Sequence, residues 1–244
     1  MIYRYDGTFD GILCCVFKSY QEKEIPEDII LSETTVLPLL PVISIKTEQD
    51  KAERVAKSIP EKMGYEVNSF VRRAFMTCLP SKEIYILLFL RLGYRYGANV
   101  MRMLTNDIVH TLFKAVRHLD RESHLFKGFI RFSIHEGVLI SEIEPKNFVL
   151  PMLAKHFCDR YPEEKFLIYD KVHKMGLIYE PYRVEIISIE KLVLPEVDEE
   201  ERKMRDLWKL FFETIEIEGR HNPRCQRTMM PKHYWGCMTE FQIK

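Results

Sequence analysis

The sequence predicts an α+β fold, with an antiparallel sheet of about four to six strands packed with a helical layer. Three observations favour this class. Apolar residues recur at helical spacing through 47–125, and the spacing changes to that of two β-hairpins over 126–190. The chain also lacks βαβ alternation and a glycine-rich phosphate loop. We therefore expect a single domain over 1–244, in which the helix-rich and sheet-containing parts precede a C-terminal helix and a basic tail.

Composition limits the classes of protein that this chain can belong to. It has 244 residues, 46% of them hydrophobic, and its 36 Lys+Arg balance its 36 Asp+Glu. These values exclude an intrinsically disordered chain and a uniformly basic nucleic-acid coat. The longest strongly apolar stretch, 84–90, is shorter than the roughly 20 residues that span a bilayer, and no signal-peptide pattern opens the chain. We expect a cytoplasmic protein without membrane contact. The spacing of its six cysteines predicts no disulfide framework, and we expect no cofactor.

The elements before residue 126 are expected to be mainly helical. A short strand at 2–5 precedes a helix at 9–20, and the proline-bearing segment 21–46 is typical of a connector with brief extended pieces. Four further helices follow, because residues 47–50 resemble a capping box and Asn68, Ser81 and Asn106 each suit a helix start.

The elements after residue 126 are expected to be mainly strands. The predicted strands lie at 129–134, 138–143, 166–169, 177–179 and 183–189, with a helix at 149–157 between the two hairpins. The acidic run 196–201 marks the first turn of a last helix, whose negative charges suit the positive end of the helix dipole. We interpret the apolar stripe of that helix as core; it consists of Met204, Leu207, Trp208, Phe211, Phe212 and Ile215.

Positive charge is concentrated in two segments of this neutral chain. In 114–131, Arg117, Arg121 and His124 share a helical face through their i, i+4 and i, i+7 spacing. Segment 220–235 has four cations, no acid and adjacent aromatics, which are the ingredients of phosphate contact and base stacking. The alternative is that such a segment pairs with acidic faces of the protein. The candidate nucleic-acid-binding residues are Arg117, Arg121, Lys127, Arg131, Arg220, Asn222, Arg224, Gln226, Arg227, Lys232, Tyr234 and Trp235, with Asn222 also a good helix N-cap.

Glu122 and His124 are the candidate catalytic residues. A carboxylate and an imidazole form a plausible acid–base pair, but at this spacing they converge only if the helix ends there. The alternative is a structural role, in which Glu122 orients Arg121 or caps a neighbour. Asp170 follows a predicted strand and is close to Lys171 and His173, and hydrogen bonding within a turn is enough to explain it. No spacing typical of a metal site is present.

Several motifs resemble those of a bacterial family that is labelled only as belonging to DNA metabolism. They are 3–11 (YRYDGTFDG), 121–132 (RESHLFKGFIRF), 143–145, 156–157 and 168–170, and 220–235 (RHNPRCQRTMMPKHYW). The family is a domain of unknown function, encoded beside a radical-SAM protein assigned to DNA modification or repair. A similar domain is fused elsewhere to uracil-DNA glycosylases. The resemblance implies a role in DNA modification or repair and identifies no catalytic residue.

Three hypotheses remain open from the sequence. The leading one is a DNA-binding accessory protein that works with a radical-SAM partner. The second is an enzyme that acts on DNA or a nucleotide by acid–base chemistry through Glu122 and His124. The third is a protein-interaction scaffold without DNA contact, whose basic C-terminal segment binds an acidic partner surface.

Overall fold

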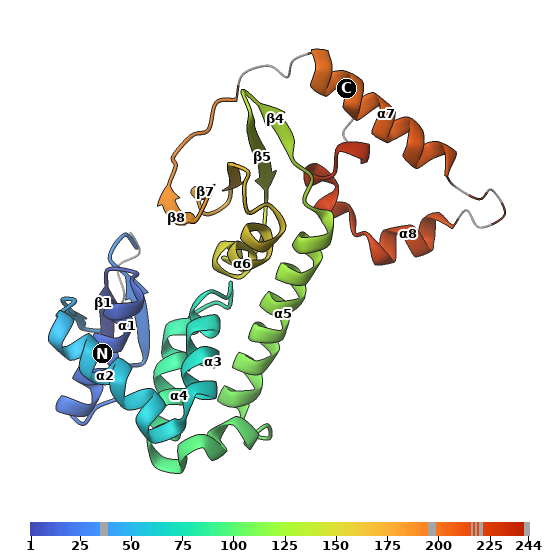
Figure 1. Cartoon of the computed structure of the whole chain (residues 1–244). Helices are drawn as coiled ribbons and strands as arrows, with labels where there is room; N and C mark the ends of the chain where they lie inside the picture. Colours follow the sequence, from blue (N-terminus) through green and yellow to red (C-terminus); the bar gives the residue numbers. More distant parts are fainter. Residues whose placement is uncertain (35–38, 195–198, 216, 218, 220–221, 242–244) are drawn as a thin grey trace. The chain divides into compact units, whose positions relative to one another are not determined.

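A computed structural model describes residues 1–34, 39–194, 199–215, 217, 219 and 222–241. The chain divides into two compact units, the first over Met1–Leu119 and the second over Asp120–Lys244. Helix α5 (Asp107–Phe129) contributes residues to both units (Figure 1). The predicted α+β class is confirmed. The described ranges contain no helix with the length and apolar content needed to cross a bilayer.

The first unit contains a small parallel sheet. Strand β1 (Ile2–Tyr5) lies between β2 (Asp28–Leu31) and β3 (Val42–Ser44) and runs parallel to both. The extended pieces expected in 21–46 are therefore present at β2 and β3. Their pairing with β1 was not expected, because strands of three or four residues carry too little periodicity to indicate partners.

Helices form the rest of the first unit. They are α1 (Phe9–Gln21), α2 (Gln49–Met63), α3 (Tyr65–Phe75), α4 (Lys82–Tyr96), the 3₁₀ helix η1 (Gly97–Arg102) and the start of α5. Their apolar faces form one core with β1, in which Tyr3, Tyr5, Phe70 and Phe89 are fully buried.

The four predicted helices form, and Ser81 occupies the N-cap of α4 as expected, although without a side-chain hydrogen bond. Two of the other three predicted caps are wrong. The capping box at 47–50 does not form, because α2 has Glu48 at its N-cap, without a side-chain hydrogen bond, and Thr47 precedes the cap. The hydroxyl of Thr47 instead donates to Asp6 Oδ2 at 2.7 Å. Asn68 lies inside α3, which begins after Gly64. Asn106 caps α5 as expected, since its Oδ1 accepts from the N–H groups of Ile108 and Val109 at 3.1 and 3.3 Å.

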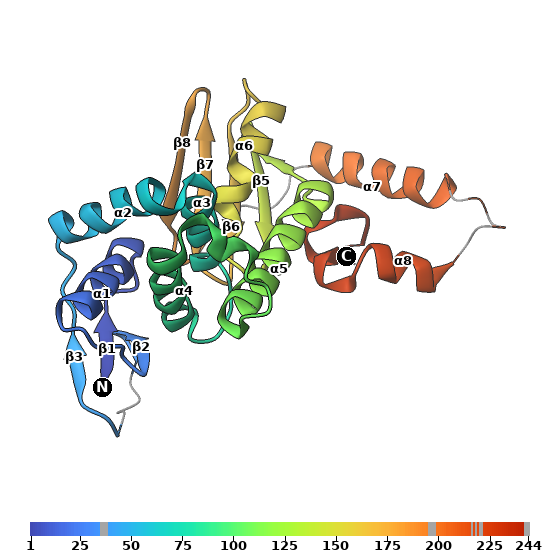
Figure 2. The ribbon, with the colours of Figure 1, turned by 90° about the horizontal axis from the view of Figure 1, so that it is seen from below.

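The second unit contains a five-stranded sheet that is mixed rather than antiparallel. Its order is β4 (Ser133–His135), β5 (Val138–Ile143), β6 (Phe166–Asp170), β7 (Met175–Glu180) and β8 (Arg183–Ser188). The central pair β5–β6 is parallel, whereas the other pairs are antiparallel. The prediction failed here because α6 (Leu150–Arg160) is a crossover helix between two parallel strands, rather than a link between two separate hairpins. Figure 2 shows α6 beside this sheet, where it contacts β7 and β8.

Helix α5 extends further than the sequence indicated. The strand predicted at 129–134 is wrong for residues 129–132, because α5 continues through Phe129 and β4 begins only at Ser133. The guanidinium group of Arg131 donates to the carbonyl oxygens of Gly128 and Ile130 at 2.9 and 3.3 Å, which satisfies acceptors left open at the end of the helix.

The last helices are α7 (Glu199–Thr214) and α8 (Pro223–Met229), followed by the 3₁₀ helices η3 (Lys232–Cys237) and η4 (Thr239–Phe241). The interpretation of the α7 stripe as core is wrong, since no residue of α7 is buried. Leu207 and Phe211 are 60% and 51% exposed. The helix is held at one face, where Trp208 Nε1 donates to Glu240 Oε2 at 3.3 Å and Phe212 packs edge-on against Phe241.

Candidate functional site

The two cation-rich segments contact each other within the second unit. The ring of Tyr234, in η3, packs edge-on against Phe126 of α5 at a centroid distance of 4.9 Å and lies 5.3 Å from Phe129. The backbone N–H of Arg131 donates to the carbonyl oxygen of Cys237 at 3.0 Å. Segments far apart in the sequence therefore pack against each other.

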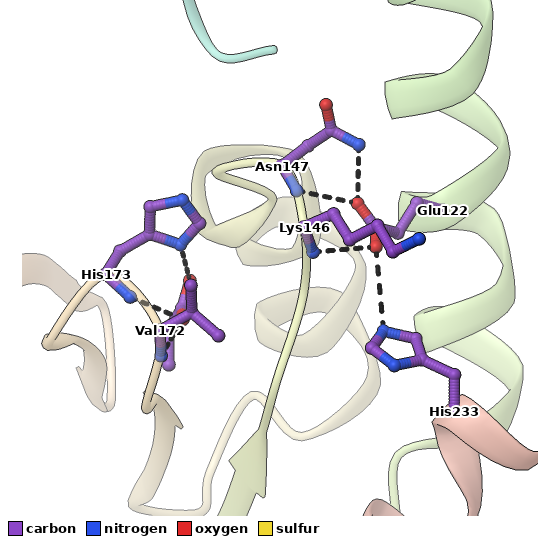
Figure 3. A network of polar contacts seen from close by, with 7 residues as sticks. Glu122, Lys146, Asn147, Val172, His173 and His233 are labelled. Atoms are coloured by element: carbon purple, nitrogen blue, oxygen red, sulfur yellow. Dashed lines mark hydrogen bonds and ion pairs between the residues drawn. The ribbon is translucent and has the colours of Figure 1, made fainter. Parts of the chain in front are cut away.

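Glu122 is a buried carboxylate of α5 in this region. Its side chain is 3% exposed on the inner face of α5. Oε1 accepts a hydrogen bond from the N–H of Lys146 at 2.9 Å, and Oε2 accepts from the N–H and the Nδ2 of Asn147 at 2.9 and 2.6 Å (Figure 3). These bonds fix the segment that leads from β5 into α6.

The imidazole beside Glu122 belongs to His233 rather than to His124. Nε2 of His233 lies 4.0 Å from Oε1 of Glu122, and its side chain is 39% exposed and thus reachable from solvent (Figure 3). His124 is exposed in the middle of α5, because the helix does not end at this point. Residues two apart on a helix do not face each other, so the structure does not bring Glu122 and His124 together.

A second carboxylate–imidazole pair lies at the turn between β6 and β7. Asp170 is fully buried, and its Oδ1 accepts from the N–H groups of Val172 and His173 at 2.9 and 3.0 Å. Its Oδ2 lies 2.7 Å from Nδ1 of His173, whose side chain is 30% exposed (Figure 3). The turn chemistry expected of Asp170 is therefore present, together with an oriented imidazole that sequence spacing alone did not indicate.

One short segment contacts both pairs. The backbone of Lys146 and Asn147 binds Glu122, and the next residue, Phe148, packs edge-on against His173 at a centroid distance of 5.5 Å. An imidazole that contacts a carboxylate through one nitrogen leaves the other nitrogen able to exchange a proton. Within the described ranges, no group of three or more His, Cys, Asp or Glu side chains could hold a metal ion.

The aromatic candidates already have partners inside the protein. Tyr234 is buried, and burial followed by the charge of Glu122 raises its pKa to about 12, so its phenol stays protonated. Trp235 stacks on Phe241 at 4.3 Å, donates from Nε1 to the carbonyl oxygen of Met230 at 2.9 Å and has the Lys232 ammonium 5.6 Å from its ring centroid. Both side chains hold the C-terminal segment in place.

The candidate cations differ in how they are engaged. Arg131 forms an ion pair with the buried Glu240 at 3.2 Å. Arg227 donates from Nε to the carbonyl oxygen of Pro223 at 3.0 Å. Arg121, Arg224 and Lys232 are exposed, and none has an acidic partner among the described residues.

The remaining candidates are distributed as follows. Asn222 is the N-cap of α8, where its Oδ1 accepts from the N–H of Cys225 at 2.9 Å, as the sequence predicted. Gln226 and Lys127 are half-buried. Arg117 is exposed on the part of α5 that belongs to the first unit, and Arg220 lies outside the described residues.

A family model described as a domain of unknown function, DUF4130, matches residues 80–240, which is more than half of the chain. No curated protein and no solved structure matches. The matched range includes the buried carboxylates Glu122 and Asp170 and both cation-rich segments.

Proposed function

The chain belongs to the DUF4130 family, and we propose that it binds DNA through a cationic surface of its second unit. We call the exposed side chains of Arg121, Lys146, Arg224 and Lys232 the cationic surface. The observation that carries the proposal is the packing of η3 on α5, which joins the two cation-rich segments. In this role the protein is an accessory that works with a radical-SAM partner in DNA modification or repair, as the resemblance of its motifs implies.

The state of these cations favours a phosphate-binding role. Their side chains have no acidic partner among the described residues, so a phosphate would not have to displace an internal ion pair. Each lysine or arginine that neutralises a phosphate releases condensed counterions, and this is the main source of sequence-independent affinity for DNA. A neutral net charge therefore does not oppose local binding at this surface.

The exposed face of α7 supports the second part of the proposal, a protein partner. Leu207, Leu210 and Phe211 are 60%, 56% and 51% exposed, and apolar side chains gathered on one helix are typical of a protein-binding surface. In the proposal, the cationic surface holds DNA while α7 contacts the radical-SAM protein. A scaffold without DNA contact would use α7 and leave the cationic surface unoccupied.

The test is the salt dependence of binding to a short labelled DNA duplex, followed by fluorescence anisotropy. The wild-type chain should bind at low salt, and its affinity should fall steeply as salt increases. Arg121→Glu and Lys232→Glu should each weaken binding and reduce the slope of log K against log salt by about 0.9 for each phosphate that is no longer neutralised. Lys57→Glu, on an exposed lysine of the first unit, is the control with the same change in charge. No binding at low salt, or equal losses in all three variants, would refute the proposed surface.

The second candidate function is acid–base chemistry on DNA or a nucleotide. It is favoured by the two imidazoles, His173 and His233, that lie beside buried carboxylates and remain partly exposed. His173→Gln and His233→Gln would be assayed on damaged and modified DNA, with His124→Gln for comparison. Turnover that is unchanged in all three variants would exclude these histidines from the reaction.

A further inference from the structure

The five-stranded sheet of the second unit has two edges that differ in how they are covered. At the β4 edge, the N–H of Ile134 donates to Glu201 Oε2 of α7 at 3.4 Å. The same helix contacts the hydroxyl of Ser133 through Arg205. At the other edge, β8 pairs with β7 on one side, and no strand of the described residues pairs with its second side. A helix therefore blocks the edge at β4, whereas the six residues of β8 present an open edge within the described part of the chain.

The hydrogen bonds between β7 and β8 show which backbone groups lie at that open edge. In an antiparallel pair, residues that bond to the neighbouring strand alternate with residues that do not. The N–H of Ile189, just after β8, donates to the carbonyl oxygen of Lys174 at 2.9 Å, in the register of the two strands. The odd-numbered residues of β8 therefore bond to β7. The even-numbered residues direct their N–H and C=O groups to the open edge, and these residues are Val184, Ile186 and Ser188.

The side chains at this edge are suited to a second strand. Val184 and Ile187 are 48% and 41% exposed, and β-branched residues on an unprotected edge favour pairing with another chain. Arg183 and Glu185 are exposed on either side of Val184, where they form an ion pair with each other at 2.6 Å. The order of cation, apolar residue and anion is its own complement when the strand is reversed. A second copy of β8 therefore matches this edge in charge.

We propose that β8 pairs antiparallel with β8 of a second copy of this chain, about a twofold axis at Val184. Residues directly opposite each other in an antiparallel pair share one face of the sheet, so the axis passes through a residue rather than between two. An axis at Glu185 would oppose two like charges, and an axis at Ile186 would place Glu185 opposite Ile187. With the axis at Val184, Arg183 of each copy lies opposite Glu185 of the other.

The backbone supports the same register. Val184 is one of the residues whose N–H and C=O groups point outward, so the two copies of Val184 exchange two hydrogen bonds across the axis. The contact uses the same surface on both chains and closes with two of them. It buries a small area, so we expect a weak dimer whose population rises with protein concentration. None of its residues belongs to the cationic surface, and the contact does not require DNA.

The experiment is sedimentation velocity of the whole chain without DNA, over about a hundredfold range of protein concentration. The wild-type chain should pass from monomer to dimer within that range. Val184→Pro removes the outward N–H and keeps the bonds between β7 and β8, because proline is tolerated on edge strands. It should weaken the dimer by about tenfold or more. Val184→Thr is its control, since threonine keeps the N–H group and the β-branched shape and should dimerise as the wild-type chain does.

Charge reversal tests the register. Arg183→Glu places two glutamates opposite each other on both sides of the axis and should weaken the dimer by about tenfold or more. Arg183→Glu combined with Glu185→Arg restores opposite charges and should restore the dimer. Lys203→Glu is the control with the same change in charge, because Lys203 pairs with Glu199 on α7 and so lies on the helix that covers the other edge of the sheet.

A wild-type chain that stays monomeric over the whole range would overturn the proposal. A dimer that neither Val184→Pro nor Arg183→Glu weakens would do the same, as would one that Lys203→Glu weakens equally, because the contact would then lie elsewhere. A combined variant that remains as weak as Arg183→Glu would overturn the axis at Val184. Far-UV circular dichroism checks the fold of each variant, and the charge reversals decide the question if Val184→Pro does not fold.

Discussion

Replacing Glu122 with glutamine tests whether this buried carboxylate holds the second unit together. The native side chain accepts three hydrogen bonds, one at Oε1 from the N–H of Lys146 and two at Oε2 from Asn147. Glutamine provides one oxygen and one NH₂ group. If its oxygen faces Asn147, its NH₂ group faces the N–H of Lys146. Two donors then face each other at the position where the native N–H and carboxylate oxygen form a hydrogen bond of 2.9 Å.

The expected cost follows from these three contacts. A hydrogen bond to a charged group contributes about 1.5–3 kcal/mol, and a neutral one about 0.5–1.5 kcal/mol. The substitution removes one charge-assisted bond and converts two others into neutral bonds. Since neighbouring contacts do not add fully, we expect the free energy of unfolding to fall by about 2–4 kcal/mol.

The assay is urea unfolding followed by tryptophan fluorescence. The two tryptophans of the chain, Trp208 and Trp235, both belong to the second unit, so the signal reports on this unit. With a slope of about 2 kcal/mol per molar urea, Glu122→Gln should lower the midpoint by about 1–2 M. Glu144→Gln is the control with the same loss of charge. Glu144 is exposed and paired with Lys171, and surface pairs contribute about 0–1 kcal/mol.

One result would refute this reasoning. If Glu122→Gln unfolds at the same urea concentration as Glu144→Gln, the carboxylate does not organise the segment between β5 and α6. The three hydrogen bonds would then contribute no more than a surface ion pair does. Glu122 would have to be explained by a role other than anchoring, and acid–base chemistry with His233 would be the first alternative.

Two further predictions concern pKa values. Burial, followed by the positive charge of Lys127, lowers the pKa of His156. The unfolded chain therefore binds a proton at this histidine more readily than the folded chain does. As a consequence, His156 lowers the free energy of unfolding as pH falls below about 6.5, the pKa of a histidine in the unfolded chain. Lys127→Met should raise the pKa of His156 in an NMR titration, and an unchanged pKa would contradict this. Burial tends to raise the pKa of Asp6, but hydrogen bonds from Thr47 and the adjacent turn outweigh it, so that the pKa is lowered. The stability from Asp6 is present above its unfolded pKa of about 3.9 and is lost as pH falls through the lower folded value. Thr47→Val should therefore raise the pKa of Asp6, and the same carboxyl titration in both proteins would disprove the assignment.

Local signals in the sequence predicted local structure well. Asn106 and Asn222 each precede a helical pattern, and both cap the expected helix through the side-chain oxygen. Thr47 is also a residue type that caps helices, yet α2 begins one residue later with Glu48 at the N-cap, and the Thr47 hydroxyl donates to Asp6 at 2.7 Å. The identity of a capping residue can be predicted to within about one position, because distant contacts such as the one between Thr47 and Asp6 are not visible in the periodicity.

Contacts between distant segments were not predictable in this way. The apolar spacing of α7 indicates an amphipathic helix, but it does not specify whether another element covers Leu207 and Phe211. The pairing of Glu122 with His233 likewise depends on η3 packing against α5 through Tyr234. The imidazole nearest to Glu122 in the sequence belongs to His124, which the helix directs elsewhere.

The zero net charge of the chain has a physical meaning once its cations are sorted by their partners. Arg131 and Arg205 lie against Glu240 and Glu201, so their charges are compensated inside the protein and their positions are fixed. Arg121 and Lys232 have no such partner within the described ranges. Uncompensated cations on the surface suit the long-range field of a nucleic-acid backbone, whereas arginines paired inside the protein contribute little to that field. Binding at the cationic surface should therefore weaken steeply as the salt concentration rises, because exposed charges are screened most and each neutralised phosphate releases counterions.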